Sequence, residues 1–403
     1  SVVLYFVPLT CMAMTVPFLI RAVSQSLANL GSRVGTLSAV STVGSFLGTA
    51  GIGYVLIPLV ANSTTMFGCA GVLALLATVY FAVFARRLDA RAGAGAGKLT
   101  AIWVWLGLSV FLAQRQETAK LGDAVELFRG NSHFGMLQVV QVGPNSRYYL
   151  NDFLAQNIYD PEAGQSTAMF SYMLSELARA YTPEVKSALC IGMGVGIVPM
   201  DFARAGTRVD VVEINPAVVP LAEEFFDFES AKVNVIIDDG RHFLNAATNR
   251  YDAVILDAFL GDSSPAHLMS REAFAAMRRC LNEGGVLVIN CFGELDARRN
   301  YFTASLDRTL RAVFKSVKIH AQGNGNLFFV ASDQSELRRL HETDFTKVHP
   351  QARRWTEGAF ARELTMKPED GIVLTDDYNP VDYYDAANRE ELRKSLAFSM
   401  RGR

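Results

Sequence analysis

Charged residues are almost missing from the first 114 positions of this 403-residue chain. Residues 1–20 and 34–85 contain none, and residues 99–114 form a third uncharged run. At ~20 residues per crossing, the second run has room for two membrane spans, whereas the third is short for one. Several long apolar runs without a basic start also exclude a cleaved secretion signal, which has one short apolar core.

Cysteine is scarce as well, and its spacing indicates no chemistry. None of the five cysteines lies in a C-x-x-C pair or at metal-ligand spacing, so we expect no metal site. They lie in apolar runs, which is typical of small buried side chains. The chain after residue 114 is mildly acidic, which argues against a nucleic-acid partner.

The apolar runs predict helices at about residues 1–24, 35–60, 65–87 and 99–114. A transport path through a membrane needs polar or ionisable groups. These segments have almost none, so we expect an anchor in membrane lipid rather than a transporter.

The sidedness of this region has two readings. Basic residues mark the 21–33 and 86–98 loops, whereas the 61–64 turn is uncharged, which places both basic loops in the cytoplasm. If the 99–114 run crosses the membrane, the rest of the chain lies outside; if it is interfacial, the rest stays inside. The ligand inferred below is a cytosolic metabolite, which favours the inside.

The pattern changes after residue 115. Residues 135–160 predict strands with a turn at "GPNS", and residues 166–181 have the spacing of an amphipathic helix. From residue 185 on, apolar strands alternate with helices, which predicts an α/β fold with a mostly parallel sheet. The expected divisions are a transmembrane region (1–116), a small β subdomain with a helix (117–182), a Rossmann-like domain (183–350) and a carboxyl-terminal tail (351–403).

A glycine turn follows the first strand of the predicted parallel sheet. In "ALCIGMGVGIVPMDF" (188–202) the glycines are Gly192, Gly194 and Gly196. A strand, a glycine turn and a helix start let a ligand approach the backbone closely. Glu213 ends the next strand about 20 residues later, where an acid accepts hydrogen bonds from ribose hydroxyls.

Two more acids follow later strands. Asp239 stands before Gly240 in "VNVIIDDGRHFL", where it can accept from an adenine amino group, and Asp257 ends "YDAVILDAF". Carboxyl ends of strands are where open α/β sheets bind ligands. A dinucleotide fingerprint needs its third glycine at Ile197, but it comes one place earlier, at Gly196. This spacing favours a ligand of the S-adenosylmethionine type.

These motifs resemble the spermidine synthase (aminopropyltransferase) family over about residues 125–330. The stretches "LCIGMGVG", "VVEINP", "DDGRHFL" and "YDAVILDAF" with "SSPAHL" follow the family's order, and "NSHFGMLQVV" and "YYLNDFLAQ" resemble its amino-terminal β segment. The apolar start is similar to that of the membrane-fused spermidine synthase-like proteins of bacteria. The stretch "LTDDYNPVDYY" (374–384) resembles the acidic tail motif of that group.

The resemblance implies roles for single residues. Gln156 matches a glutamine that contacts the ligand, Glu213 the ribose-binding acid and Asp239 the adenine-binding acid. Asp257 matches the acid that holds and deprotonates the attacking amine. The implied substrates are S-adenosylmethionine or its decarboxylated form and a small-molecule amine. A carboxylate suits this task because an amine attacks only after losing its proton.

The chain departs from the family at several positions. Val195 replaces an acid of the glycine loop, and Leu260 stands where a second amine-side acid is expected, with Asp262 the nearest acid. A tyrosine-histidine pair is replaced by Phe170 and Ser171. A diamine is a dication whose pocket should present several acids, so these changes weaken the polyamine assignment and leave the adenosyl ligand untouched.

Three further residues have open roles. His267 follows Asp257 closely enough to line the pocket, although loop and packing roles are commoner for histidine. Asp376 and Asp377 either close over the site or cap a turn.

The leading hypothesis is a multi-pass protein of the bacterial inner membrane with a cytoplasmic transferase domain. This domain alkylates an amine by aminopropyl transfer and releases methylthioadenosine. One alternative is a methyltransferase with a non-polyamine acceptor. Another is an inactive accessory subunit of a membrane complex, although Glu213, Asp239 and Asp257 together argue against a dead site. The sequence leaves open whether the chain forms a homo-oligomer or joins a membrane complex.

Overall fold

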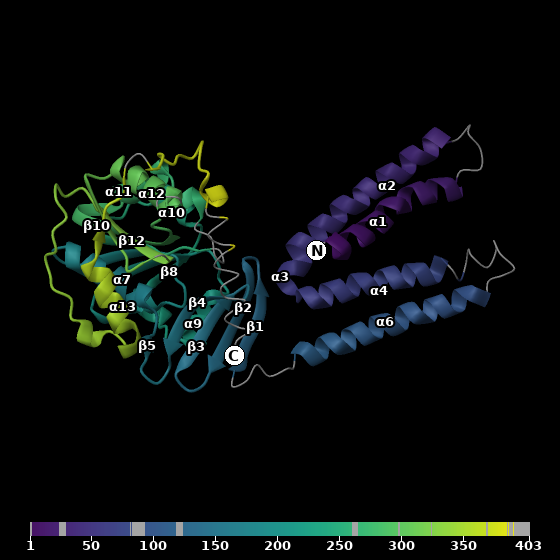
Figure 1. The fold of residues 1–403 in the computed structure, drawn as a ribbon, viewed down its shortest axis with the longest axis horizontal. Helices are drawn as coiled ribbons and strands as arrows, with labels where there is room; N and C mark the ends of the chain where they lie inside the picture. The colour runs from purple at the N-terminus through teal and green to yellow at the C-terminus, as the bar shows by residue number, and fades with distance from the viewer. Residues whose placement is uncertain are drawn as a thin grey trace. The chain divides into compact units, whose positions relative to one another are not determined.

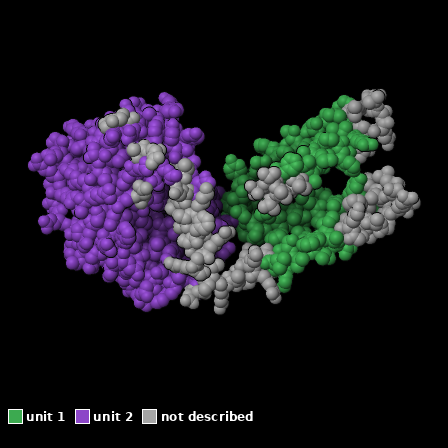
Figure 2. All heavy atoms as spheres, in the orientation of Figure 1, with its two compact units in different colours: residues 1–118 green, residues 119–403 purple. Residues whose placement is uncertain are grey.

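The computed structural model divides the chain into two compact units, Ser1–Thr118 and Ala119–Arg403, coloured green and purple in Figure 2. It describes residues 2–23, 30–80, 82, 93–117, 124–259, 265–296, 299–323, 325–367, 370–384, 386 and 390.

The first unit is helical (Figure 1). Its elements are α1 (Val2–Val23), α2 (Leu30–Gly51), the π-helical turn η2 (Ile52–Leu56), α3 (Ile57–Leu59), α4 (Asn62–Tyr80) and α6 (Gly93–Glu117). Helix α1 packs against α2, and α4 packs against α6, where Trp103 Nε1 donates to Thr78 Oγ1 at 3.1 Å. The four predicted helices are therefore present, although residues 83–87 lie outside the described part of the chain.

Two helical stretches of this unit are long and apolar enough to cross a membrane. Gly31–Leu59 has 29 residues and Asn62–Tyr80 has 19, each with a mean hydropathy of 1.5. Their large apolar side chains face outward, including Phe46, which is 72% exposed. Apolar side chains of α1 face outward as well. Cys11 of α1 and Cys69 of α4 are exposed for the same reason, so the prediction of burial is wrong for them; the other three cysteines are buried.

The second unit begins with an antiparallel sheet in the order β1-β2-β3-β4-β5. Its strands are β1 (Ala124–Ser132), β2 (Gly135–Val142), β3 (Ser146–Asn151), β4 (Leu154–Asp160) and β5 (Gln165–Ser166). Asn157 of β4 pairs with Tyr149 of β3, so both are held side by side. Helix α7 (Met169–Tyr181) follows and leads into the larger sheet.

The larger sheet has eight strands in the order β13-β11-β12-β10-β9-β6-β7-β8. Strands β6 (Ser187–Ile191), β7 (Arg208–Glu213), β8 (Asn234–Ile237), β9 (Tyr251–Leu256) and β10 (Leu281–Gly293) are parallel. Strands β12 (Gly325–Ser332), β11 (Ser316–His320) and β13 (Glu363–Leu364) add an antiparallel edge. The predicted α/β fold with a mostly parallel, Rossmann-like sheet is confirmed. Because the chain runs from β6 to β8 and then returns to β9, the sheet reverses its strand order beside β6, which is where such sheets bind ligands.

Helices cover both faces of this sheet, because successive residues of a strand point to opposite sides. In β6, Ala188 and Cys190 belong to the core formed with α7, α8 (Ile197–Arg204), α9 (Val218–Phe225) and α13 (Pro350–Ala361). Leu189 and Ile191 belong to the other core, formed with α10 (Gly240–Ala246), α11 (Arg271–Arg279) and α12 (Tyr301–Arg311). Figure 1 shows α10, α11 and α12 on one side of the sheet and α7 and α13 on the other.

Candidate functional site

A cavity of about 370 Å³ opens at the carboxyl ends of the parallel strands. Strands β6 to β10 contribute the residues at or just after their ends, and β3 and β4 of the small sheet contribute Tyr149 and Gln156. Its aromatic lining is Phe134, Tyr149, Phe170, Phe259 and Phe292. A concave site with apolar walls and a few polar groups is the usual form of a small-molecule pocket.

The glycine turn after β6 is required by close backbone packing. Gly192 has φ +88°, and a Cβ there would lie 2.3 Å from the backbone oxygen of Asp257. Gly194 has φ +51°, and a Cβ would lie 2.7 Å from Asn157 Oδ1. Both positions line the cavity. Any side chain here would clash as well as strain the backbone.

Glu213 ends β7 and holds this turn. One of its carboxylate oxygens accepts from Met193 N at 2.9 Å, and the other accepts from Asn215 N at 2.8 Å. Burial raises the pKa of the Glu213 carboxyl, while the backbone donors oppose that rise. A buried carboxylate with two donors keeps free lone pairs, so it can still accept hydroxyl groups from a ligand.

Asp239 follows β8 and starts helix α10. Its Oδ1 accepts from Arg241 N at 2.9 Å and His242 N at 3.0 Å, and its Oδ2 accepts from His267 Nε2 at 2.9 Å. Burial raises the pKa of Asp239, but the hydrogen bonds from His242 and His267 outweigh it and hold the pKa below the usual value. Asp239 is therefore an anion whose orientation is fixed by hydrogen bonds. Both Asp239 and His267 line the cavity.

Asp257 follows β9 and has a different environment. Burial raises its pKa to about 6, and the one side-chain hydrogen bond opposing the rise comes from Asn290 Nδ2, 2.8 Å from Asp257 Oδ1. Asn290 Oδ1 in turn accepts from Asn326 Nδ2 at 2.9 Å. This chain of two amides orients the carboxylate without adding a charge. A carboxyl with such a pKa exchanges protons near neutral pH, which suits a general base.

The structure brings together most residues predicted from the sequence. The predicted residues that line the cavity are Gln156, Gly192, Gly194, Glu213, Asp239, Gly240 and Asp257. Gly196 does not line it; with φ +81° it starts α8, where a Cβ would lie against the ring of Phe228. Gly240 gives close packing, because a Cβ there would lie 2.6 Å from Ile191 Cγ2.

The positions that depart from the family pattern are also placed. Phe170 lines the cavity, whereas Ser171 is buried and lies 3.2 Å from Ser166 in a hydroxyl pair. Leu260 and Asp262 lie outside the described residues.

Several polar residues of the cavity were missed by the sequence analysis. Asn290 ends the predicted strand "GGVLVIN", and a polar residue at a strand's carboxyl end was a usable signal. Asn326 had no such signal, because it reaches the cavity only through the antiparallel pairing of Asn326 with Phe292. Asn157 and Tyr149 come from the small sheet, whose packing over the larger sheet has no local signature.

Charge is divided between two halves of the cavity. Glu213, Asp238 and Asp239 lie at the ends of β7 and β8. At the ends of β9, β10 and β12, Asp257 is the single carboxylate among the described lining residues. Among the described residues no group of three or more His, Cys, Asp or Glu side chains could hold a metal ion. The arrangement can bind a hydroxyl-rich, adenosyl-like group on one side and a proton-donating group on the other.

Known proteins resemble this chain over the same region. The spermine/spermidine synthase domain profile matches residues 168–322. A polyamine aminopropyltransferase from Vibrio vulnificus is 37% identical over 233 residues, covering 52% of this chain and 74% of the relative. A probable polyamine aminopropyl transferase from Bifidobacterium longum is 25% identical over 276 residues, or 63% of this chain, which spans only 61% of that relative.

Solved structures also align with part of this chain. A probable spermidine synthase from Corynebacterium glutamicum is 19% identical, with a TM-score of 0.46 over 60% of this chain and 96% of its own. The identity to the Vibrio relative over nearly three quarters of its length is what establishes kinship. The predicted family is thus confirmed, and the chain belongs to the spermidine synthase (polyamine aminopropyltransferase) family.

Proposed function

We propose that this protein transfers an aminopropyl group from decarboxylated S-adenosylmethionine to an amine. The ammonium group of the acceptor gives a proton to the Asp257 carboxylate, and the freed nitrogen lone pair attacks the carbon next to the sulfonium. A nitrogen–carbon bond forms, the carbon–sulfur bond breaks, and its electron pair stays on sulfur. The products are an alkylated ammonium and neutral methylthioadenosine.

The environment of Asp257 carries this proposal. Its pKa of about 6 lets it accept a proton at neutral pH, and the amides of Asn290 and Asn326 fix its orientation without neutralising it. The backbone packing of Gly192 against Asp257 holds the acid next to the glycine turn. Proximity of acceptor and donor would then supply much of the rate.

The other half of the cavity supports an adenosyl donor. Glu213 retains acceptor capacity for ribose hydroxyls, and Asp239 is an anion for an amino group of the base. Gln156 from β4 lines the same cavity. The relatives whose names state polyamine aminopropyl transfer are consistent with this donor.

Product analysis tests the proposal. The full chain in detergent is incubated with S-adenosylmethionine or its decarboxylated form and a panel of amines, and the nucleoside product is identified by mass spectrometry. Methylthioadenosine released only with an amine present supports aminopropyl transfer. Binding of the donor without any product, in the presence of every amine tested, would indicate an accessory subunit instead.

A second candidate is methyl transfer from S-adenosylmethionine to an acceptor that is not a polyamine. The half of the cavity at the ends of β9, β10 and β12 would hold the acceptor. The observation that favours methyl transfer is that Asp257 is the single carboxylate among the described residues lining that half. A diamine carries two charges, and one carboxylate complements only one of them. Release of S-adenosylhomocysteine in the same assay would select this candidate.

We also infer that the first unit anchors the protein in membrane lipid, with the second unit at the cytoplasmic face. The apolar stretches Gly31–Leu59 and Asn62–Tyr80 have the length and composition of spans. A fluorescent protein fused to the carboxyl terminus should fluoresce, and the protein should stay in the membrane fraction after an alkaline carbonate wash. Activity of a carboxyl-terminal alkaline phosphatase fusion would place the unit outside.

A further inference from the structure

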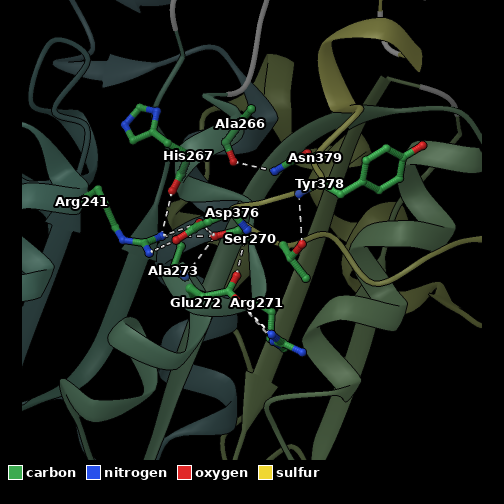
Figure 3. Close-up of polar contacts among 11 residues, drawn as sticks. Arg241, Ala266, His267, Ser270, Arg271, Glu272, Ala273, Asp376, Tyr378 and Asn379 are labelled. Atoms are coloured by element: carbon green, nitrogen blue, oxygen red, sulfur yellow. Dashed lines mark hydrogen bonds and ion pairs between the residues drawn. The ribbon is translucent and has the colours of Figure 1, made fainter.

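The carboxyl-terminal stretch 374–379 is hydrogen-bonded to residues 266–271, a segment that borders the cavity. Arg271 N donates to Leu374 O at 2.8 Å, and Asn379 Nδ2 donates to Ala266 O at 2.8 Å. The two stretches are separated by about a hundred residues in the chain and lie side by side in Figure 3. We call residues 374–379 the clasp.

Asp376 is the central residue of the clasp. Arg241 Nη2 donates to Asp376 Oδ2 at 2.6 Å and Arg241 Nη1 to Asp376 Oδ1 at 3.3 Å. The Asp376 backbone N–H donates to Glu272 Oε2 at 3.0 Å, and the Ser270 hydroxyl donates to the Asp376 carboxylate. Figure 3 shows this carboxylate between Arg241 and Ser270. A two-point contact to a guanidinium fixes orientation as well as position.

Arg241 connects the clasp to the cavity. Its Nη1 also donates to the backbone oxygen of His267 at 3.1 Å, and its own backbone N–H donates to Asp239. His267 Nε2 then contacts the free oxygen of Asp239. Arg241, His267 and Asp239 therefore form a closed ring of contacts, with Asp239 and His267 at the cavity wall and Asp376 outside it.

We propose that Asp376 is a positioning residue for the donor half of the site, acting through Arg241 on His267 and Asp239. The inference rests on the proposed adenosyl donor. Without Asp376, the Arg241 side chain gains alternative rotamers. Its hydrogen bond to the His267 backbone oxygen is then broken for part of the time. A ligand must then order this wall on binding, which weakens its affinity.

The neighbouring acid provides a matched control. The Asp377 side chain is exposed and has no hydrogen bond or ion pair to any residue that the structure describes. Asp376→Asn and Asp377→Asn remove the same charge at adjacent positions. Any effect of net charge is therefore shared, whereas loss of the side-chain contacts to Arg241 and Ser270 is confined to Asp376→Asn.

The experiment measures binding of methylthioadenosine to the full chain by calorimetry, together with the KM for donor, the KM for amine and kcat. We expect Asp376→Asn to raise the methylthioadenosine Kd and the donor KM about fivefold or more, the lower range of coupling between separate sites. The amine KM and kcat should change less than about twofold, and Asp377→Asn should match wild type. Asn379→Ala, which removes the contact to Ala266, should raise the same Kd by a smaller factor.

A double variant tests the route of the effect. Arg241→Gln alone should also weaken methylthioadenosine binding. Arg241→Gln with Asp376→Asn should bind no more weakly than Arg241→Gln, because each change removes the same Arg241–Asp376 contact. Unchanged binding by Asp376→Asn, or equal losses for Asp376→Asn and Asp377→Asn, overturns the clasp inference and leaves the proposed function intact. A wild-type chain that binds neither donor nor methylthioadenosine overturns both.

Discussion

Replacing Asp257 by asparagine should change activity and stability in opposite directions. The substitution keeps the shape of the side chain and an oxygen that can accept from Asn290 Nδ2. It removes the only group proposed to accept the proton of the amine. A general base contributes roughly 10²- to 10⁴-fold to a rate, so we expect kcat to fall by about that factor while the methylthioadenosine Kd stays within about twofold.

The stability change follows from the raised pKa. The Asp257 carboxyl has a pKa of about 6 in the folded chain against an ordinary 3.8. As pH rises between these values, the unfolded chain releases this proton first, so the free energy of unfolding falls. The loss is complete above pH 6 and amounts to about 3 kcal/mol at most, at about 1.4 kcal/mol per pH unit. Asparagine carries no charge at any pH and avoids this loss.

Thermal unfolding of the full chain in detergent measures the difference. At pH 7 the Asp257→Asn variant should unfold several degrees above wild type, and at pH 4 the two midpoints should converge. The wild-type kcat/KM for the amine, which reports groups of the free enzyme, should also fall about tenfold per pH unit below pH 6. A variant that is inactive and less stable at pH 7 would refute the reasoning, because the ionised Asp257 carboxylate would then stabilise the folded chain instead of destabilising it. Retained turnover would remove Asp257 from the mechanism.

Three further changes test the rest of the site. Glu213→Gln replaces one acceptor oxygen by an NH2 group and leaves one of two buried backbone donors without an acceptor, so calorimetry should show methylthioadenosine binding weakened about tenfold; unchanged affinity would argue against a role of the acid in donor binding. Gly194→Ala should weaken donor binding, because its Cβ would lie 2.7 Å from Asn157 Oδ1 and push that side chain within the cavity wall. Gly206→Ala also has a positive φ but open space and should lower only the melting temperature; equal effects on binding would contradict the steric explanation. Asn290→Ala removes the hydrogen bond that lowers the pKa of Asp257, so the acidic limb of the kcat/KM–pH profile should move to higher pH, and a move to lower pH would reverse the assigned cause.

Much of the cavity could be predicted because its signals are local. Gly192, Glu213, Asp239 and Asp257 each stand at the carboxyl end of a strand, and parallel strands bring these ends to one edge. Long uncharged runs likewise predicted the helices of the first unit, and short apolar segments alternating with helices predicted the strands of the second. The residues next to it in the sequence show whether a residue stands at the end of its own strand.

The contacts of Asn326 with Asn290 behind Asp257, and of Asp376 with Arg241, have no such local signal. Asn326 reaches Asn290 because β12 pairs antiparallel with β10, and no pattern within β12 specifies that register. Asp376 and Arg241 are 135 positions apart in the chain. Asp377, with the same carboxylate one residue later, has no hydrogen bond or ion pair among the described residues.

The sequence by itself thus determined the order of strands and helices, the glycine turn and the acids at strand ends, because short-range sterics and hydrophobic spacing act within a few residues. The tertiary structure alone decided that two amides orient Asp257 and that Asp376, of two adjacent aspartates, accepts from Arg241. The physical reason is that these contacts depend on strand register and long-range packing, which arise from the whole core and are encoded in no single segment.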